Sequence, residues 1–150
     1  MIITFSVPGT PQPCQYRQTT RGVIYQKAAT KSWQKAVAMA AMVAVREQCP
    51  SFKLGMYSGP VEASAIFRMQ PSKSKLRKIR LNQHDEIVHN SGNTHLQKPD
   101  ITNLWKGAED GLKHILWADD CQVQSVMIQK MWSNGNPGAE IRIDLVEYEG

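Results

Sequence analysis

The sequence has no long hydrophobic run and few cysteines. Its longest stretch without a polar side chain, residues 36–45, has ten residues, which is about half of what a helix needs to cross a bilayer. We therefore expect no membrane span. The N-terminal residues do not show a basic segment followed by an apolar one, so no signal peptide is predicted. Three widely spaced cysteines, Cys14, Cys49 and Cys121, fit reduced thiols better than a disulfide framework. These features predict a cytoplasmic protein.

Several catalytic signatures are also missing. The phosphate-binding pattern Gly-x-x-x-x-Gly-Lys does not occur, so a nucleotide cofactor is not expected. No cysteine has a placed histidine partner, which argues against a cysteine nucleophile. A zinc or His-Asn-His nuclease is a poor fit, because the histidine-rich stretch has neither Cys-x-x-Cys nor His-x-x-x-His spacing. That stretch contains His84, His89, Asn90 and His95.

The composition is that of one globular domain. The chain has 150 residues, of which 41% are apolar and 21% charged, enough to bury a core. Alternation of apolar residues predicts strands, and a period near 3.6 predicts helices. The expected strands are residues 2–7, 61–69, 122–132 and 140–147, with the last two forming a hairpin, and the expected helices are residues 28–47, 73–81 and 101–116. We expect an α+β fold with one domain over residues 1–150.

The helix over residues 28–47 has an unusual surface. Its segment AVAMAAMVAV, residues 36–45, is apolar on every face. A helix of this kind is normally buried on more than one side. Either the sheet and another element enclose it, or a second subunit does.

Positive charge is concentrated in the middle of the chain. The net charge is +5, and residues 68–80 contain six basic residues and no acidic one. Such a segment favours a polyanionic partner, of which nucleic acid is the commonest. A solvated basic loop is the alternative. The proline-containing loop over residues 10–22 adds Arg17 and Arg21.

The candidate chemistry lies around the helix over residues 101–116. Asp100 precedes this helix, Lys106 and Asp110 lie on its polar side, and Asp119 and Asp120 follow it. If the next strand carries the acidic pair back toward the helix, the carboxylates can share a Mg²⁺ ion. Such a site hydrolyses phosphodiesters, with a lysine stabilising the leaving oxygen. Each residue also has a simpler interpretation: Asp100 as a helix cap, the acidic pair as a turn and Lys106 as a solvated side chain.

The same region resembles a family signature. The segment from Lys98 to Val123 reads KPDITNLWKGAEDGLKHILWADDCQV. It resembles the RusA family of Holliday junction resolvases, in which K-P-D-x-D-N-x-x-K is followed by D-A-L, an aromatic residue and D-D-x-Q-V. Near the N-terminus FSVPGTPQP resembles the opening strand and proline loop of that family, and PSKSKLRKIR resembles its basic segment.

The resemblance implies a small mixed β-sheet packed against two main helices, in a two-fold homodimer. It implies a Mg²⁺-dependent endonuclease, with Mn²⁺ as an alternative ion, that binds four-way DNA junctions in recombination and repair and is commonly encoded by phages or prophages. By position, the catalytic residues are Asp100, Lys106 and Asp120, and the metal ligands are Asp100, Asp120 and Asp119. The expected DNA-binding residues are Arg17, Arg21, Lys73, Lys75, Arg77, Lys78, Arg80 and Lys98.

One position departs from the family pattern. Thr102 stands where the family has the second acid of D-x-D. A threonine hydroxyl is neutral, so the site loses one negative charge and metal affinity with it. The alternative function is therefore a protein that binds junction DNA with impaired or absent cleavage.

Overall fold

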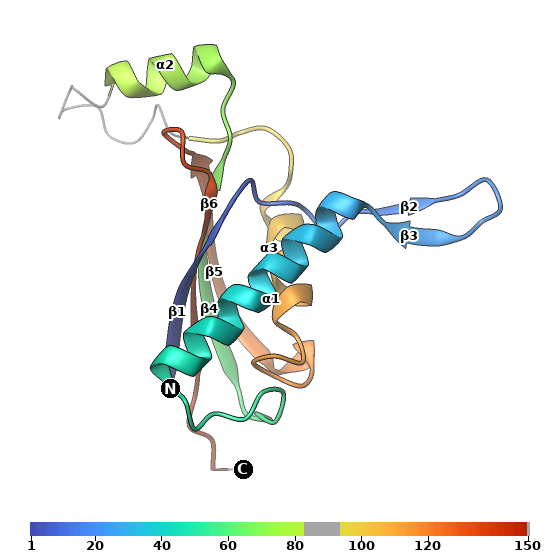
Figure 1. The fold of residues 1–150 in the computed structure, drawn as a ribbon, viewed down its shortest axis with the longest axis vertical. Helices are drawn as coiled ribbons and strands as arrows, with labels where there is room; N and C mark the ends of the chain where they lie inside the picture. The colour runs from blue at the N-terminus through green and yellow to red at the C-terminus, as the bar shows by residue number, and fades with distance from the viewer. Residues whose placement is uncertain (83–93, 150) are drawn as a thin grey trace.

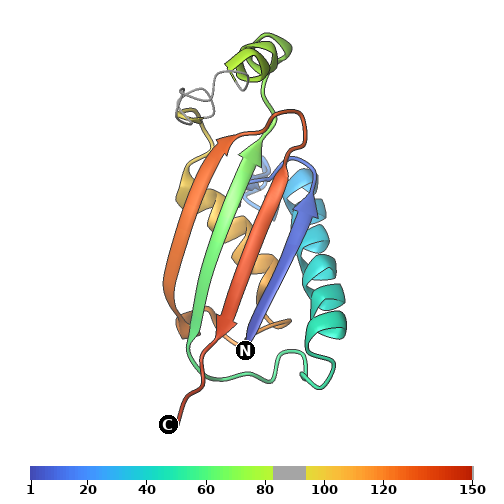
Figure 2. The same cartoon turned by 90° about the vertical axis from the view of Figure 1, so that its left-hand side faces the viewer.

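Two long helices cover one face of a four-stranded sheet in the computed structural model (Figures 1 and 2), which describes residues 1–82 and 94–149, without the side chains of residues 80–82. The strands are β1 (Ile2–Pro8), β2 (Tyr16–Gln18), β3 (Ile24–Gln26), β4 (Val61–Met69), β5 (Val123–Trp132) and β6 (Gly138–Leu145). The helices are α1 (Ala28–Gln48), α2 (Lys73–Asn82), α3 (Ile101–Leu112) and the short 3₁₀ helix η2 (Asp120–Gln122). The expected α+β class and mixed sheet are confirmed.

The core lies between the sheet and the helices. The strand order is β1-β6-β4-β5, with β4 antiparallel to β6 and parallel to β5. Alternate residues of β4 are buried from Val61 to Met69, as the period of a strand with one covered face requires. The buried residues of β6 and of both long helices join them in one cluster. Figure 2 shows the opposite face of the sheet without a covering helix.

The expected hairpin of the last two strands is wrong. Strand β4 lies between β5 and β6, so these two strands do not pair with each other. After β5 the chain crosses the end of β4, where the N–H of Ser133 donates to the carbonyl oxygen of Met69 at 2.9 Å. Strand β6 then pairs with the edge of β4 opposite to β5.

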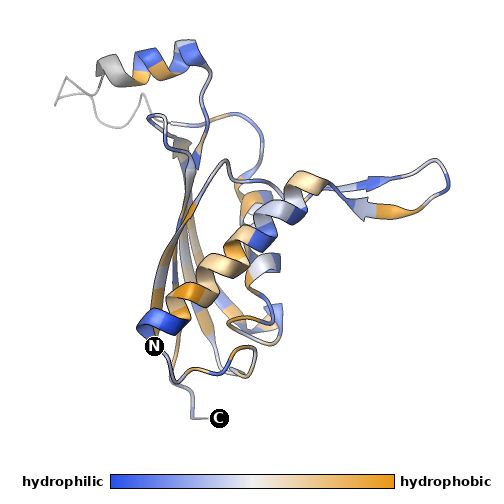
Figure 3. Ribbon diagram, viewed as in Figure 1, coloured by the Kyte–Doolittle hydropathy of each residue, from blue (hydrophilic) through white to orange (hydrophobic). Residues whose placement is uncertain are grey.

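Helix α1 is buried along one side only. It packs against β1 and α3, and its buried residues include Trp33, Val37 and Ala41. On the other side Met39 is 57% exposed and Val43 is 50% exposed. Figure 3 shows the later half of α1 as largely hydrophobic up to its hydrophilic last turn. The chain's own elements therefore cover one side of α1 and leave the side with Met39 and Val43 exposed.

The two long helices touch through a glycine. A Cβ atom built on Gly111 of α3 would lie 2.6 Å from the carbonyl oxygen of Gln34 in α1. Only a residue without a side chain permits this approach. Helix α3 then ends at Leu112, four residues earlier than expected, because Lys113 is extended and His114 has a positive φ of 67°.

A further two-stranded sheet was not expected from the sequence. Strands β2 and β3 pair antiparallel and form a hairpin that projects from the body of the domain (Figure 1). Helix α2, which was expected, lies beyond the end of the sheet at which α3 begins. In the described part of the chain, no helix is long and apolar enough to cross a membrane.

Candidate active site

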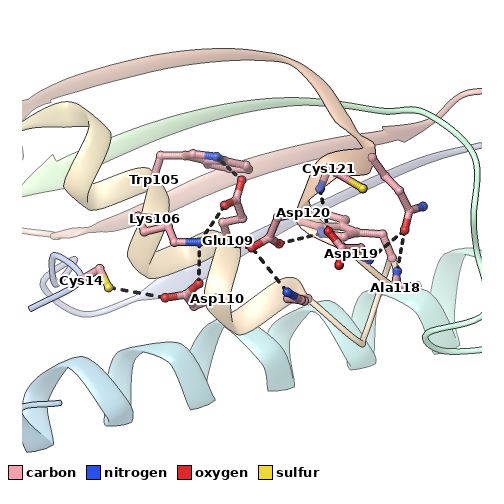
Figure 4. A network of polar contacts seen from close by, with 12 residues as sticks. Cys14, Trp105, Lys106, Glu109, Asp110, Ala118, Asp119, Asp120 and Cys121 are labelled. Carbon is pink, nitrogen blue, oxygen red and sulfur yellow. Dashed lines mark hydrogen bonds and ion pairs between the residues drawn. The ribbon is translucent and has the colours of Figure 1, made fainter. Parts of the chain in front are cut away.

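Lys106 is the centre of a cluster of acidic side chains. Its Nζ atom lies 3.2 Å from Oε1 of Glu109, 3.1 Å from Oδ1 of Asp110 and 3.1 Å from Oδ2 of Asp120 (Figure 4). Glu109 and Asp110 come one turn after Lys106 on α3, at the spacings that make helix neighbours. Asp120 comes from η2. The turn after α3 therefore brings the second acid of the Asp-Asp pair to the lysine.

Two indole rings orient the carboxylates. The Nε1 atom of Trp117 donates to Oδ1 of Asp120 at 3.3 Å, and that of Trp105 donates to Oε2 of Glu109 at 2.9 Å. Both indole rings are largely buried. The polar edge of each ring thus faces the network while its body fills the core, which is how buried tryptophan satisfies its N–H. Lys113 adds a second positive charge, 3.8 Å from Oδ2 of Asp120.

The two neighbouring aspartates have different roles. Asp119 caps η2, since its Oδ1 accepts from the backbone N–H of Cys121 at 3.0 Å. This bond, an interaction with the Cys121 side chain and the charge of Lys113 lower the pKa of Asp119. Asp120 points to Lys106 instead. Of the pair, Asp120 is the residue that joins the network.

Gln122 holds this acidic turn on the body of the domain. Its Oε1 accepts from the N–H groups of Ala118 at 3.0 Å and Asp119 at 2.8 Å. Its Nε2 donates to the carbonyl oxygens of Tyr57 at 2.9 Å and Gly59 at 3.0 Å. All four hydrogen-bonding directions of one amide are used. Gln122 thereby sets the position of Asp120, two residues before it.

The network favours a charged lysine. Partial burial lowers the pKa of Lys106, but the hydrogen bonds that its ammonium donates to Asp110, Asp120 and Glu109 outweigh that effect and raise the pKa overall. Asp110 also accepts from Sγ of Cys14 at 3.4 Å. Burial, together with this bond and the charge of Asp110, raises the pKa of the Cys14 thiol. Lys106 therefore carries its proton throughout the neutral range.

Asp100 stands apart from this network. It occupies the N-cap position of α3 but makes no side-chain capping bond, and it is exposed. The segment before it is held by Lys130, whose Nζ donates to the carbonyl oxygens of Gln97 at 2.6 Å and Pro99 at 3.0 Å. Thr102 lies exposed in the first turn of the helix. Among residues 1–82 and 94–149, no three His, Cys, Asp or Glu side chains are arranged to hold a metal ion.

The comparison with known families bears on this arrangement. The family model described as Endodeoxyribonuclease RusA matches residues 7–144, which include the Lys106 network and the segment around Asp100. The chain belongs to the RusA endodeoxyribonuclease family.

A second comparison finds a shorter match. The uncharacterized protein YqaN of Bacillus subtilis (strain 168) is 39% identical to this chain over 46 residues. The matched segment covers 31% of this RusA-family chain and 32% of YqaN. The chain thus matches about a third of the length of that relative.

The basic residues expected to bind DNA fall in three parts of the RusA-family chain. Arg17 and Arg21 belong to the β2–β3 hairpin, and both are exposed. Lys98 is exposed before α3. The remaining ones lie on α2, which is mainly hydrophilic in Figure 3, where Lys73, Arg77 and Lys78 are exposed, Lys75 is half-buried and the side chain of Arg80 is outside the described part.

The histidine-rich stretch is described only at its end. His84, His89 and Asn90 lie outside the described residues. His95 is buried, 4% exposed, with its ring 4.3 Å from that of Trp132 between centroids. Burial, assisted by the charge of Lys130, lowers its pKa. The contacts of His95 are those of a core residue.

Sequence reasoning missed several members of the site. Asp110 was placed on the polar side of the helix with Lys106 but was given no role in the site, and Glu109 was not considered. The i,i+3 and i,i+4 spacing from Lys106 was the signal available for both. Gln122 was part of the signature, D-D-x-Q-V, without an assigned role. Lys130 had no sequence signal, because its partners are backbone carbonyls 31 and 33 residues away.

Proposed function

We propose that this chain is a Mg²⁺-dependent endonuclease that binds four-way DNA junctions and cuts paired strands in recombination and repair. The observation that carries the proposal is the contact of Lys106 with Asp120, which joins the two halves of the family signature. A lysine held among carboxylates, next to exposed basic elements, suits the hydrolysis of a polyanion's backbone.

The residues that would hold the metal are Asp100 and Asp120, with Asp119 as a weaker candidate. Carboxylate oxygens are the ligands that Mg²⁺ takes in proteins, and one or two of them suffice beside waters and substrate phosphate. The carboxylate of Asp100 makes no capping bond, so it is available to such an ion. When bound, Mg²⁺ or Mn²⁺ supplies an activated water and neutralises charge on the phosphate.

Lys106 acts on the substrate through its charge. Its raised pKa keeps the ammonium protonated. An ammonium at the scissile phosphate stabilises negative charge on the leaving oxygen, an effect that is strongest when the group is already held in place. Glu109 and Asp110 hold it on one side and Asp120 on the other.

DNA binding is assigned to three basic regions. They are the hairpin with Arg17 and Arg21, the helix α2 with its lysines and arginines, and Lys98 beside Asp100. Each ion pair with a phosphate releases condensed counterions from the DNA. The exposure of Arg17, Arg21, Lys73, Arg77, Lys78 and Lys98 supports this role.

We propose that the functional unit is a two-fold homodimer formed through α1. The exposed side of this helix presents Met39, Met42 and Val43. A groove between α1 and β1, lined by Phe5, Met39 and Val43, continues this surface. A dimer with two equivalent sites matches the near two-fold symmetry of a four-way junction.

Thr102 favours a second candidate function. The residue is exposed in the first turn of α3, next to Asp100, and contributes no charge. A site short of one acid binds junctions through its basic regions without cutting them. This alternative is a junction-binding protein with impaired or absent cleavage.

The decisive experiment is cleavage of a labelled synthetic four-way junction with Mg²⁺ and then with Mn²⁺. We expect paired cuts that the variant Asp100→Asn abolishes, and binding by both proteins in Ca²⁺ on a native gel. Binding without cutting by the wild-type chain would establish the alternative. Absence of junction binding at low salt would contradict both.

A further inference from the structure

The β2–β3 hairpin begins beside the Lys106 network. The N–H of Cys14, two residues before β2, donates to the carbonyl oxygen of Asn103 in α3 at 3.0 Å. The thiol of the same residue contacts Asp110, a partner of Lys106. A Cβ atom on Gly107 would lie 2.6 Å from the carbonyl oxygen of Gln12. The base of the hairpin is therefore packed directly on the helix that carries the candidate active site.

Beyond that base the hairpin leaves the domain. Figure 1 shows it extending away from the sheet and from α1. All three residues of β2 are exposed, and so is the turn from Thr19 to Val23. Bonds between Thr19 and Val23 close the turn, with the N–H of Thr19 donating to Val23 O at 2.8 Å. The hairpin is thus an ordered ribbon that makes few contacts with its own domain.

The exposed side chains of the ribbon are unusual for a solvent-facing element. Tyr16 is 60% exposed and Ile24 is 67% exposed, and Val23 is 59% exposed. Arg17 lies opposite Tyr25 across the two strands, so these two side chains share one face. An isolated two-stranded hairpin is marginally stable in water. Exposed aromatic and aliphatic side chains on such a hairpin indicate a surface used in binding.

The charge of this region indicates the kind of partner. The first 46 residues contain six basic residues and no aspartate or glutamate. Arg17 and Arg21 are on the hairpin, and Lys27 and Lys31 lie at its junction with α1. A partner of high negative charge complements this segment, and the width of a two-stranded ribbon matches the major groove of duplex DNA.

We infer that the β2–β3 hairpin is an arm that lies along a groove of one duplex branch of the DNA. In this position it places the adjacent DNA strand of the junction at Lys106. Arg17 and Arg21 contact phosphates, while the tyrosine and aliphatic side chains pack against sugars and base edges. This inference rests on the proposed function, since it assigns the part of the DNA-binding surface that is nearest to the chemistry.

The first test shortens the arm in the full-length chain. Tyr16 and Gln26 face each other across the hairpin, so replacing residues 17–25 by two glycines leaves a two-residue turn between paired residues. We expect this variant to bind a four-way junction in Ca²⁺ about 100-fold more weakly, because an arm with two phosphate contacts and apolar contacts is lost. Light scattering should show the same mass as the wild-type chain.

The second test leaves the fold of the arm in place. The double variant Arg17→Ala with Arg21→Ala should lower the slope of log affinity against log salt by about 2, roughly 0.9 for each lost phosphate contact. The matched control is Lys53→Ala with Arg142→Ala, which removes two positive charges exposed elsewhere. A junction carrying 5-iodouracil should photocrosslink to peptides containing Tyr16 or Tyr25.

The outcomes separate the inference from the proposed function. If the wild-type chain binds the junction and both arm variants bind equally well, the inference is overturned and the proposed function stands. A halved mass of the arm-shortened variant would show that the arm contacts a second copy of this chain, which also overturns it. If the wild-type chain does not bind junctions, the proposed function fails and the arm has no DNA to hold.

Discussion

The ammonium nitrogen of Lys106 lies 3.1 Å from a carboxylate oxygen of Asp120, 14 residues further along the chain. Helix α3 supplies the lysine, and the turn that closes at Trp117 returns the chain to it. The indole of Trp117 donates to the other oxygen of the same carboxylate. Lysine, acid and ring thus form a single hydrogen-bonded unit, in which the carboxylate of Asp120 is held from both of its oxygens.

Replacing Lys106 tests whether its charge takes part in cleavage. Lys106→Met keeps an unbranched side chain and removes the ammonium, so we expect at least a 100-fold loss of Mg²⁺-dependent junction cleavage. Binding in Ca²⁺ should change only a few-fold, since the lysine is half exposed and one charge among many. Lys53→Met, an exposed lysine in a loop, is the control. Equal cleavage rates for both variants would remove Lys106 from the proposed chemistry.

Restoring an acid at position 102 tests the metal site. Thr102→Asp adds a carboxylate in the first turn of α3, where the helix dipole favours negative charge by about 0.3–1 kcal/mol. We expect cleavage to rise about 10-fold and to need less Mg²⁺, because the ion gains a charged ligand. Thr102→Asn, which is similar in size and neutral, should have no such effect. Identical Mg²⁺ titrations for the aspartate variant and the wild-type chain would place position 102 outside the site.

The amide of Gln122 is expected to stabilise both the fold and the site. Gln122→Ala removes four hydrogen bonds to backbone groups on two segments, so the free energy of unfolding should fall by about 1–3 kcal/mol. Cleavage should fall as well, since Asp120 loses its anchor. Gln124→Ala is the control, because that side chain is bonded to the exposed Glu62, and its effect should stay within about 0.5 kcal/mol. Urea denaturation measures the free energy of unfolding of both variants. Equal denaturation midpoints for Gln122→Ala and Gln124→Ala would contradict the anchoring role.

The buried imidazole of His95 should make stability depend on pH. Burial and the charge of Lys130 lower its pKa in the folded state, while the unfolded chain keeps a value of about 6.5. Above that pH both states are neutral and nothing changes. As pH falls below about 6.5, the unfolded state binds a proton first, so stability is lost until the folded pKa is passed.

The measurement compares the wild-type chain with His95→Phe, which keeps a ring against Trp132 and does not titrate. Between pH 7.5 and pH 5 the wild-type chain should lose more free energy of unfolding than His95→Phe does. An NMR titration of the His95 ring protons gives the folded pKa directly. A value at or above 6.5 would rule out this source of pH dependence.

The elements of the fold could largely be predicted because their signals are local. Strand β4 has the expected bounds, since five buried residues alternate strictly from Val61 to Met69. Helix α1 extends one residue beyond its expected end. The β2–β3 hairpin was missed because its residues are exposed on both sides and so show no apolar alternation. The end of α3 was misjudged because a tight turn at His114 keeps Leu116 buried without a helix.

The sequence by itself determined the strands of the main sheet and the positions of helices α1, α2 and α3, the family signature that the chain carries and its departure from that signature at Thr102. Period and motif are properties of neighbouring residues. The tertiary structure alone decided that β4 separates β5 from β6, that Glu109 and Asp110 join Asp120 around Lys106, and that Gln122 and Lys130 hold the two acidic segments. These relations depend on backbone hydrogen bonds and packed faces between distant segments, such as Ser133 with Met69. No local pattern of side chains encodes which distant surfaces meet.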